Sequence, residues 1–428
     1  MLMFVFSAVV STVQPTHHGL TLDEVYARAK QQSEMLAIKT FDIEMAKVRY
    51  DQLVALALPS LRIIGGARLS DGLKTFETHL ALDESSGISA NTTNDNFRYD
   101  LRLNARVPLF NGFLDRYAKK AGKLAEELQT SNYEKAQQQL YLDVTEFFYQ
   151  IVWYTRDLEQ VDALIQALEK RCQELAKRIH LGKSRRSELL SAQSERATAL
   201  LLRTRIQGFL NETCAIASYF LDIPKGQLTL KDNDVSMQLG TLLDYTKSAE
   251  TPPDVKYAFI YQKYLDAQLL QAKAAHWPSL SLEANYYVLQ SPQSRDWTIL
   301  LTLDLPLFEG GLTRARIEEQ KLHTLSGDLN VRATQKAFNR DVSLAYERAM
   351  TKNNELLDYK TNTALLEQTY QLLLGDYQQG ITNHIEVLRA LERVYDHRRA
   401  LVAAEIALKR AVIQLQVTAG LLPVGTPP

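Results

Sequence analysis

The residues that could do chemistry are not spaced as catalytic centres require. The chain has eight histidines and two cysteines in 428 residues. It contains no HExxH, GxSxG or Walker sequence, and no pair of carboxylates at catalytic spacing. The histidines lack cysteine or aspartate companions at ligand spacing, so metal ligation by them is not expected. The sequence therefore predicts no enzyme, no metal site and no cofactor.

Charged residues, unlike catalytic ones, do cluster in this chain, and they do so at a turn near residues 181–187. Lys183, Arg185 and Arg186 follow Gly182 there. Three basic residues at a turn suit either a docking patch for a partner or a solubilising cap, and exposed charge runs usually have the second role. Over the whole chain 49 basic and 50 acidic residues balance, so no basic excess exists to displace counterions from nucleic acid.

The elements that must position these residues occur twice. VPLFNG (107–112) returns as LPLFEG (305–310), an offset of 198 at which Gly182 recurs as Gly380 and Glu188 as Glu386. LPSL (58–61) returns as WPSL (277–280). Self-similarity of this kind indicates a duplicated architecture. One unit therefore occurs twice: a helix, a proline, two strands, a proline, a long helix, a glycine turn and a helix.

The repeat predicts the domain organisation. Residues 1–19 are typical of a secretory signal, although no Lys or Arg precedes the apolar run. No other window approaches the 18 apolar residues that a transmembrane helix needs. In chain order, the remaining segments are a first repeat (20–222) with a hairpin over 59–110 and a tip turn at 181–187, a connector (223–253), a second repeat (254–422) with a hairpin over 278–308 and a tip turn at 379–384, and a tail (423–428).

The segments between the prolines alternate with period 2, the pattern of strands with two different faces. From Phe97 to Val107, apolar residues alternate with a polar set that includes three arginines and Asp100. Each of four such segments is about ten residues long, enough to cross a bilayer when tilted. A soluble sandwich would alternate too, but two hairpins of this length favour a membrane sheet.

A membrane-spanning sheet of four strands is incomplete. Its edge amides cannot stay unsatisfied in lipid, and the smallest single-chain barrels have about eight strands. The sequence therefore predicts that several copies close one barrel, each giving two hairpins. The polar face is then expected to line a water-filled lumen with Arg62, Arg68, Arg98, Asp100, Arg102, Arg106, Glu283 and Asp304.

Long helices are predicted on both sides of the glycine turns. Between Leu140 and Ile179, apolar residues recur at alternating spacings of four and three, which is the heptad of a left-handed coiled coil. The second half keeps this register from Phe338, with lapses at Lys352 and Thr363. Such a helix would be roughly 100 Å long at 1.5 Å per residue.

The two turns carry helix-ending and helix-starting signals. Gly182 and Gly380 suit the left-handed residue that follows a helix. Asn383 and Glu386 are spaced as a capping box for the returning helix. Both turns are therefore expected to join antiparallel helices.

The motifs occur in a specific order. LTLDEV (20–25) follows the apolar run, LPSL and WPSL precede the strands, VPLFNG and LPLFEG follow them, and LGKSRRSELLSAQ and QGITNHIEVLRAL form the turns. Each motif is weak alone. Their duplicated order, over residues 20–422, resembles the TolC family of outer-membrane efflux proteins.

The resemblance implies a mixed fold of α-helix and transmembrane β-strand. A homotrimer would form a 12-stranded β-barrel, with four strands per chain, that continues into a long periplasmic α-helical coiled-coil barrel. The implied place is the outer membrane of a Gram-negative bacterium, with residues 71–96 and 290–296 outside the cell and residues 223–253 as an equatorial belt. The implied function is a passive exit duct of a tripartite efflux or type I secretion system, without a cofactor, that works with a periplasmic adaptor and an inner-membrane transporter.

The resemblance also implies roles for the turns. In the family, acidic residues just after the second turn form a constriction that opens by an iris-like motion. Glu386 holds that position, Glu188 is its counterpart in the first repeat, and Arg389 stands where a second acid occurs. Glu386 and Arg389 of neighbouring subunits are expected either to pair across the closed mouth or to remain solvated. The tips expected to dock the adaptor are Gly182, Lys183, Ser184, Arg185, Arg186, Gly380, Ile381, Thr382 and Asn383.

Two questions stay open from the sequence. A trimeric coiled-coil surface or adhesion protein with a β anchor also combines coils with strands, although its strands are C-terminal and its coil is continuous. Within the TolC family the cargo, whether drug, metal or protein, is also open. The six methionines do not cluster as a lumen for soft metals would require.

Overall fold

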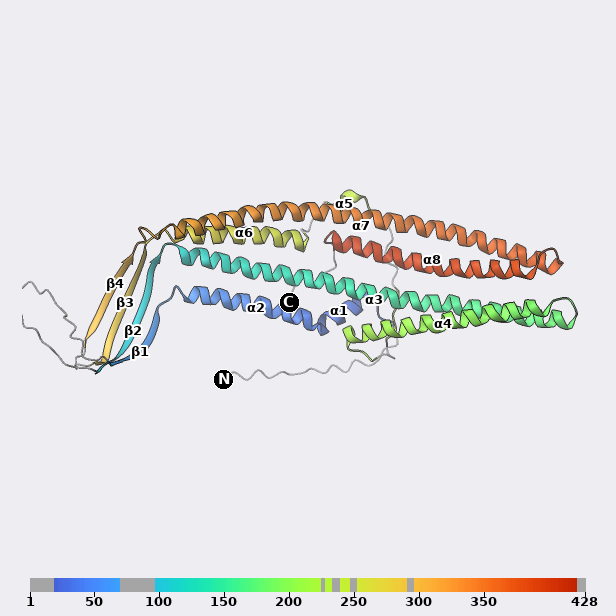
Figure 1. Cartoon of the computed structure of the whole chain (residues 1–428), viewed down its shortest axis with the longest axis horizontal. Coiled ribbons are helices and arrows are strands. Elements are labelled where there is room, and N and C mark those ends of the chain that lie inside the picture. The colour runs from blue at the N-terminus through green and yellow to red at the C-terminus, as the bar shows by residue number, and fades with distance from the viewer. Residues whose placement is uncertain are drawn as a thin grey trace, which may run out of the picture. The chain divides into compact units, whose positions relative to one another are not determined.

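A computed structural model describes residues 19–69, 97–224, 228–232, 239–246, 252–290 and 296–421. Within these ranges the chain forms eight helices and four strands (Figure 1). In chain order they are α1 (Leu22–Gln32), α2 (Glu34–Ala55), β1 (Ser60–Leu69), β2 (Phe97–Asn111), α3 (Leu114–His180), α4 (Arg186–Leu221), α5 (Leu242–Thr246), α6 (Pro253–Ala274), β3 (Ser279–Gln290), β4 (Trp297–Asp304), α7 (Leu312–Gln379) and α8 (His384–Thr418).

The four strands form one antiparallel sheet in the order β1-β2-β3-β4 (Figure 1). β1 pairs with β2, and β3 with β4, so each hairpin joins segments of one predicted repeat. The β2–β3 pairing joins the two hairpins. Its register shifts between Pro108 and Phe110, as it does at a β-bulge, which bends a strand and re-aims its side chains. Within the chain, β1 and β4 are the two edges of the sheet.

The register gives the sheet one polar and one apolar face. Directly paired residues lie on the same face, and the pairs Arg62–Asn104 and Asn104–Asn285 continue one polar row across three strands. On the opposite face Ile63 of β1 is 75% exposed and Ile299 of β4 is 62% exposed. In the described part of the chain, this apolar face is therefore left open.

The described residues fall into two compact units. Those within 1–40, 131–256 and 333–428 form one unit, and those within 41–130 and 257–332 form the other, which contains the sheet. Each predicted repeat contributes residues to both units. The long helices α3 and α7 do the same.

The heptad positions form the core of the helical unit. Val144, Leu168 and Leu175 of α3 are at most 1% exposed, and Val342 and Ala349 of α7 are fully buried. Removing such side chains from water is the main stabilising contribution to a coiled-coil seam. The predicted apolar stripe is therefore the buried stripe.

The two lapses in the second stripe have local explanations. Thr363 is buried, but its hydroxyl donates a hydrogen bond to the Tyr359 carbonyl at 2.7 Å, so it leaves no unsatisfied group. Lys352 Nζ donates to Glu355 at 2.7 Å and keeps its charge at the surface of the helix. The seam therefore continues through both positions.

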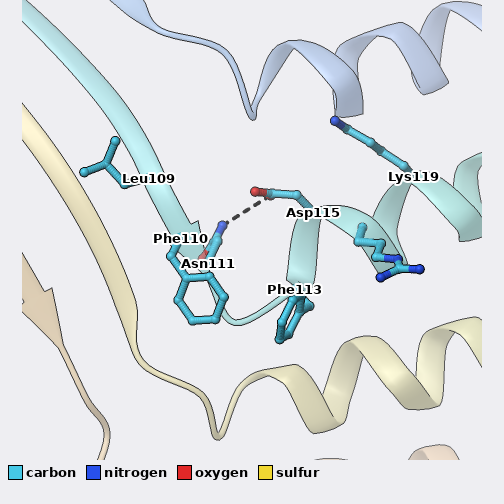
Figure 2. A pocket seen from close by; sticks show the side chains of 7 residues that line it. Leu109, Phe110, Asn111, Phe113, Asp115 and Lys119 are labelled. Carbon is cyan, nitrogen blue, oxygen red and sulfur yellow. Dashed lines mark hydrogen bonds between the residues drawn. The ribbon is translucent and has the colours of Figure 1, made fainter.

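A tight junction joins β2 to α3 (Figure 2). Gly112 and Phe113 both have positive φ, +58° and +65°. A β-carbon on Gly112 would lie 2.7 Å from the Ala274 carbonyl oxygen and from Trp277 Cβ, so no other residue fits. Across the junction, Asn111 Nδ2 donates to Asp115 at 3.2 Å.

Several predicted segments lie outside the described residues. They are the predicted signal except residue 19, the predicted external loop 71–96, most of the loop 290–296, parts of the connector, and the tail. Among the helices that are described, none has the length and apolarity needed to cross a membrane.

Two glycines at matched positions test the junction. Gly112→Ala should destabilise the protein by about 3 kcal/mol, because a left-handed alanine is added to a backbone clash. Gly310→Ala, at the equivalent position with φ +61° and open space around it, should cost only about 1 kcal/mol. Thermal unfolding of both variants beside the wild type measures the difference. Equal effects would show that the close approach at residue 112 does not matter.

Candidate functional site at the two helical turns

The first turn lies between α3 and α4. Gly182 has φ +70°, as its helix-ending position predicts, and the Lys183 N–H donates to the Arg178 carbonyl at 2.8 Å. Lys183, Arg185 and Arg186 are exposed. The Ser184 hydroxyl donates to Glu188, which ties that carboxylate to the turn. The turn therefore presents three cations to solvent and holds its acid.

The second turn lies between α7 and α8. Gly380 has φ +80°, and the Asn383 side chain accepts the Glu386 N–H at 3.0 Å, which is the predicted helix cap. In a full capping box the Glu386 carboxylate would accept the backbone N–H of Asn383. Here it accepts hydrogen bonds from the side chains of Thr382 and Asn383 instead. Ile381 is 70% exposed at this tip.

A buried cationic cluster lies close to the two turns, and it was not predicted from the sequence. Arg171 of α3 points its Nη2 at His384 Nδ1, 3.2 Å away at the start of α8. The same guanidinium lies 4.1 Å from the centroid of the Tyr377 ring of α7, and Arg178 lies 4.6 Å from that ring. Cation–π contacts stabilise such positions when they are desolvated. Arg171 thus links the first helical hairpin, formed by α3 and α4, to the second, formed by α7 and α8.

The chemistry of this cluster requires a neutral histidine. Burial, and then the charge of Arg171, lower the pKa of His384, which is only 1% exposed. Since Arg171 donates to Nδ1, the proton of His384 must lie on Nε2. Within the described residues, His384 Nε2 and Arg171 Nε are buried without a hydrogen-bond partner. The cluster is therefore tightly packed but not fully satisfied.

Two carboxyls meet further along the same helices. Glu392 of α8 and Glu195 of α4 share a side-chain hydrogen bond, beside the apolar contact of Ala199 with Leu388 and Leu391. Burial, together with Glu195 and Asp396, raises the pKa of Glu392 to about 7, and Arg389 opposes that shift. Two half-buried carboxylates this close cannot both ionise without repulsion.

The polar face of the sheet contains a second group of predicted residues. Asn104 is 6% exposed, and its Nδ2 donates to Glu283 at 2.6 Å and to Asn285 at 2.7 Å. Arg106 is the register partner of Glu283. The amides and the carboxylate therefore form a network across β2 and β3 that fixes their pairing.

The other predicted lumen residues surround this network. Asp100 and Arg102 approach to 3.9 Å, and Arg62 and Asp304 are exposed on β1 and β4. Arg68 and Arg98 are direct partners in the register, while their side chains lie outside the description. The backbone register of the sheet places all eight positions in one set of alternating residues.

The structure does not bring Glu386 and Arg389 together as an ion pair within the chain. Glu386 is held by its own turn, and Arg389 acts on Glu392 one turn further along α8. The expected pairing of Glu386 and Arg389 between neighbouring subunits stays a prediction. Sequence reasoning missed Arg171, His384 and Glu392, because none of them is at a position of the heptad stripe. Only His384 had a nearby signal, since it directly follows the predicted cap Asn383.

The fold is similar to that of solved outer-membrane proteins. VceC from Vibrio cholerae superimposes with a TM-score of 0.77 over 93% of this chain and 96% of that one, at 17% identity. CusC superimposes with a TM-score of 0.79 over 93% of this chain and 91% of that one, at 18% identity. The solved CusC work describes transmembrane channel formation. Four strands per chain with long helices, the coarser part of the predicted fold, are thus confirmed.

Sequence comparison finds similar outer-membrane efflux proteins. Residues 245–421 match the family described as outer membrane efflux protein. TolC from Vibrio cholerae is 20% identical over 97% of this chain and 94% of that protein. OprJ from Pseudomonas aeruginosa is 24% identical over 39% of this chain, and the match spans only 36% of OprJ. The predicted resemblance to the TolC family of outer-membrane efflux proteins is confirmed.

Arg171 is expected to hold the two hairpins together. Arg171→Gln should destabilise the helical unit by about 2–3 kcal/mol, because it removes the donor to a buried histidine and the closer cation–π contact. Arg178→Gln, which removes only the outer cation over the same ring, should cost less than about 1 kcal/mol. Thermal unfolding and hydrogen exchange at the two turns measure both variants. If Arg171→Gln and Arg178→Gln destabilised the protein equally, Arg171 would not be the residue that links the two helical hairpins.

Glu392 predicts a pH dependence with a definite sign. Because its folded pKa lies above the ordinary 4.5, its contribution is present below that value and is lost as pH rises through about 7. The unfolding midpoint of the wild type should therefore decrease as pH rises from about 4.5 to about 7, and level off above that value. Glu392→Gln should flatten that fall, whereas Glu212→Gln, an exposed carboxyl of α4, should not. A Glu392→Gln variant that keeps the full pH slope would contradict the assignment.

Proposed function

We propose that this chain is one subunit of a homotrimeric outer-membrane duct, which conducts cargo passively from an inner-membrane transporter and a periplasmic adaptor to the outside of a Gram-negative cell. The observation that carries the proposal is a four-stranded sheet with an exposed apolar face and two free edges. The similarity to outer-membrane efflux proteins supports an efflux role over the adhesin alternative. The duct has no catalytic step, since conduction needs a gate rather than bond chemistry.

The free edges explain why the duct needs several copies. In lipid, the unpaired amides of β1 and β4 would each lose several kcal/mol. Pairing β1 of one copy with β4 of the next satisfies both edges, and three copies give twelve strands. The exposed apolar face, with Ile63 and Ile299, would then meet lipid. The polar face, with Arg62, Arg106 and Asp304, would line the lumen.

Exposed apolar stripes on the helices beside the sheet support the same assembly. Met45 and Val48 of α2 are 49% and 55% exposed. Leu322, Leu325 and Leu329 of α7 follow helical spacing and are 60%, 59% and 64% exposed. Contiguous apolar stripes of this kind mark interfaces. We assign both to contacts between neighbouring subunits of the trimer.

The helical turns would form the periplasmic end of the duct. The cations of the first turn and Ile381 of the second are exposed, as adaptor-docking tips must be. Glu386 and Arg389 would lie at the mouth, with Glu188 in the equivalent outer position. Arg171 and the Glu195–Glu392 pair would set how readily the hairpins part in the iris-like opening. The cargo itself is selected by the transporter, which this chain does not contain.

Cysteine cross-linking tests the closure of the barrel. In a background with Cys172→Ser and Cys214→Ser, Ile63→Cys combined with Ile299→Cys or Leu301→Cys should give disulfide-linked oligomers up to trimers. Within one chain β2 and β3 separate these positions by roughly 14 Å, at about 4.8 Å per strand, so an intramolecular bond is excluded.

A matched pair controls for random collision. Leu103→Cys with Ile299→Cys uses an interior strand, so it should stay monomeric on a denaturing gel. The trimer should also give single-channel steps in a planar lipid bilayer. Cross-links that stop at dimers, or a bilayer without conductance, would refute the duct.

A further inference from the structure

The junction between β2 and α3 contains an open pocket in the sheet-containing unit that neither conduction nor gating uses. Figure 2 shows the side chains that line it. They combine apolar and aromatic groups with two cations around a hydrogen-bonded Asn111–Asp115 pair, and are Leu109, Phe110, Asn111, Phe113, Asp115, Arg116 and Lys119.

Phe113 occupies a backbone conformation that a phenylalanine avoids. Its φ of +65° is left-handed, and at the equivalent position of the second repeat the residue is Gly311, with φ +88°. The strain does not serve a core, because the Phe113 ring is 46% exposed. Strained residues of this kind persist where the side chain has a task. Here the task requires an aromatic ring on the surface.

The ring continues the apolar face of the sheet. The bulge at residues 108–110 brings Phe110 into register with Leu280, which belongs to the apolar face. Phe110 packs edge-on against Phe113 at 5.2 Å, and Phe113 packs edge-on against Trp277 at 6.2 Å. Trp277 is 57% exposed. Aromatic rings at the end of an apolar band are typical of the boundary between lipid tails and headgroups.

The cations beside this boundary are unbalanced. Residues 114–123 contain Arg116, Lys119 and two further lysines against the single acid Asp115. None of the ion pairs in the described part of the chain uses these four cations. The same stretch of the second repeat, 312–321, has three cations and two glutamates, and Lys321 pairs with Glu318 at 3.1 Å. Arg314 and Arg316 of that stretch are in no described ion pair either, but its net charge is only +1, against +3 at the first junction. The first junction therefore offers the larger excess of cations to an outside anion.

We propose that this pocket binds an acidic phospholipid of the inner leaflet, with its phosphate between Arg116 and Lys119 and its acyl chains along Phe110, Phe113 and Leu109. The assignment rests on the proposed membrane position of the sheet. Charge complementarity supports an acidic lipid over a neutral one, and the aromatic surface supports a lipid over a free anion.

Lipid titration of the full-length trimer in detergent tests the site. Phosphatidylglycerol should raise the thermal unfolding midpoint, and Arg116→Gln with Lys119→Gln should raise the half-saturating lipid concentration about tenfold, as the loss of two charge-assisted bonds implies. Arg332→Gln with Lys336→Gln, two exposed cations of α7, is the matched control and should respond like the wild type.

Phe113→Gly separates lipid binding from folding. Because glycine relieves the left-handed strain, this variant should unfold at a higher temperature without lipid, and yet gain less from phosphatidylglycerol. The site is refuted if phosphatidylcholine or inorganic phosphate stabilises as well as phosphatidylglycerol, or if the double variant and its control respond alike. A trimer that conducts but has no lipid preference refutes the lipid site alone, whereas the absence of a conducting trimer refutes the duct.

Discussion

Backbone hydrogen bonding at the edges of the sheet is the constraint on which the rest of the account depends. Within the part of the chain that the structure describes, four strands pair with one another and leave the outer edges of β1 and β4 with unmatched amides and carbonyls. Water could satisfy them in a soluble protein, but the exposed apolar face marks this sheet for lipid, where water is absent. In the proposed duct, closure with other copies resolves that conflict. The exposed apolar stripes of α2 and α7 would be covered by the same neighbouring copies.

Near the two helical turns, charged side chains rather than backbone groups have the important polar contacts. A few buried charges add to the apolar contacts between the first helical hairpin (α3 and α4) and the second (α7 and α8). Arg171 links them through a histidine that has to remain neutral, while Glu392 and Glu195 oppose the contact once both are ionised. Attraction and repulsion of similar origin therefore lie within a few helical turns of each other. The gate that we propose at these turns needs contacts of this limited strength to open.

Much of the fold follows from periodicity in the sequence. The period-2 segments, the heptad stripe and the glycine turns with positive φ all occur where the residues predict them. These features are local, so short windows reveal them. Thr363 shows the limit of this reasoning, because it counted as a lapse in the stripe and yet is buried with its hydroxyl bonded to its own helix.

The candidate site was less predictable, because its contacts join distant segments. Arg171 and His384 are 213 residues apart, and Arg171 belongs to no motif. The bulge that redirects Phe110 depends on the β2–β3 register, and the left-handed Phe113 sits where the repeat has a glycine. The expected partnership of Glu386 and Arg389 depends on a neighbouring subunit, so one chain neither supports nor opposes it.

Single-particle electron microscopy of the detergent-extracted full-length protein tests the central claim most directly. The account predicts particles with three-fold symmetry, a continuous wall where β1 of one copy meets β4 of the next, and an open lumen inside it. Monomeric particles, or assemblies in which the edges of the sheet remain unpaired, would contradict it.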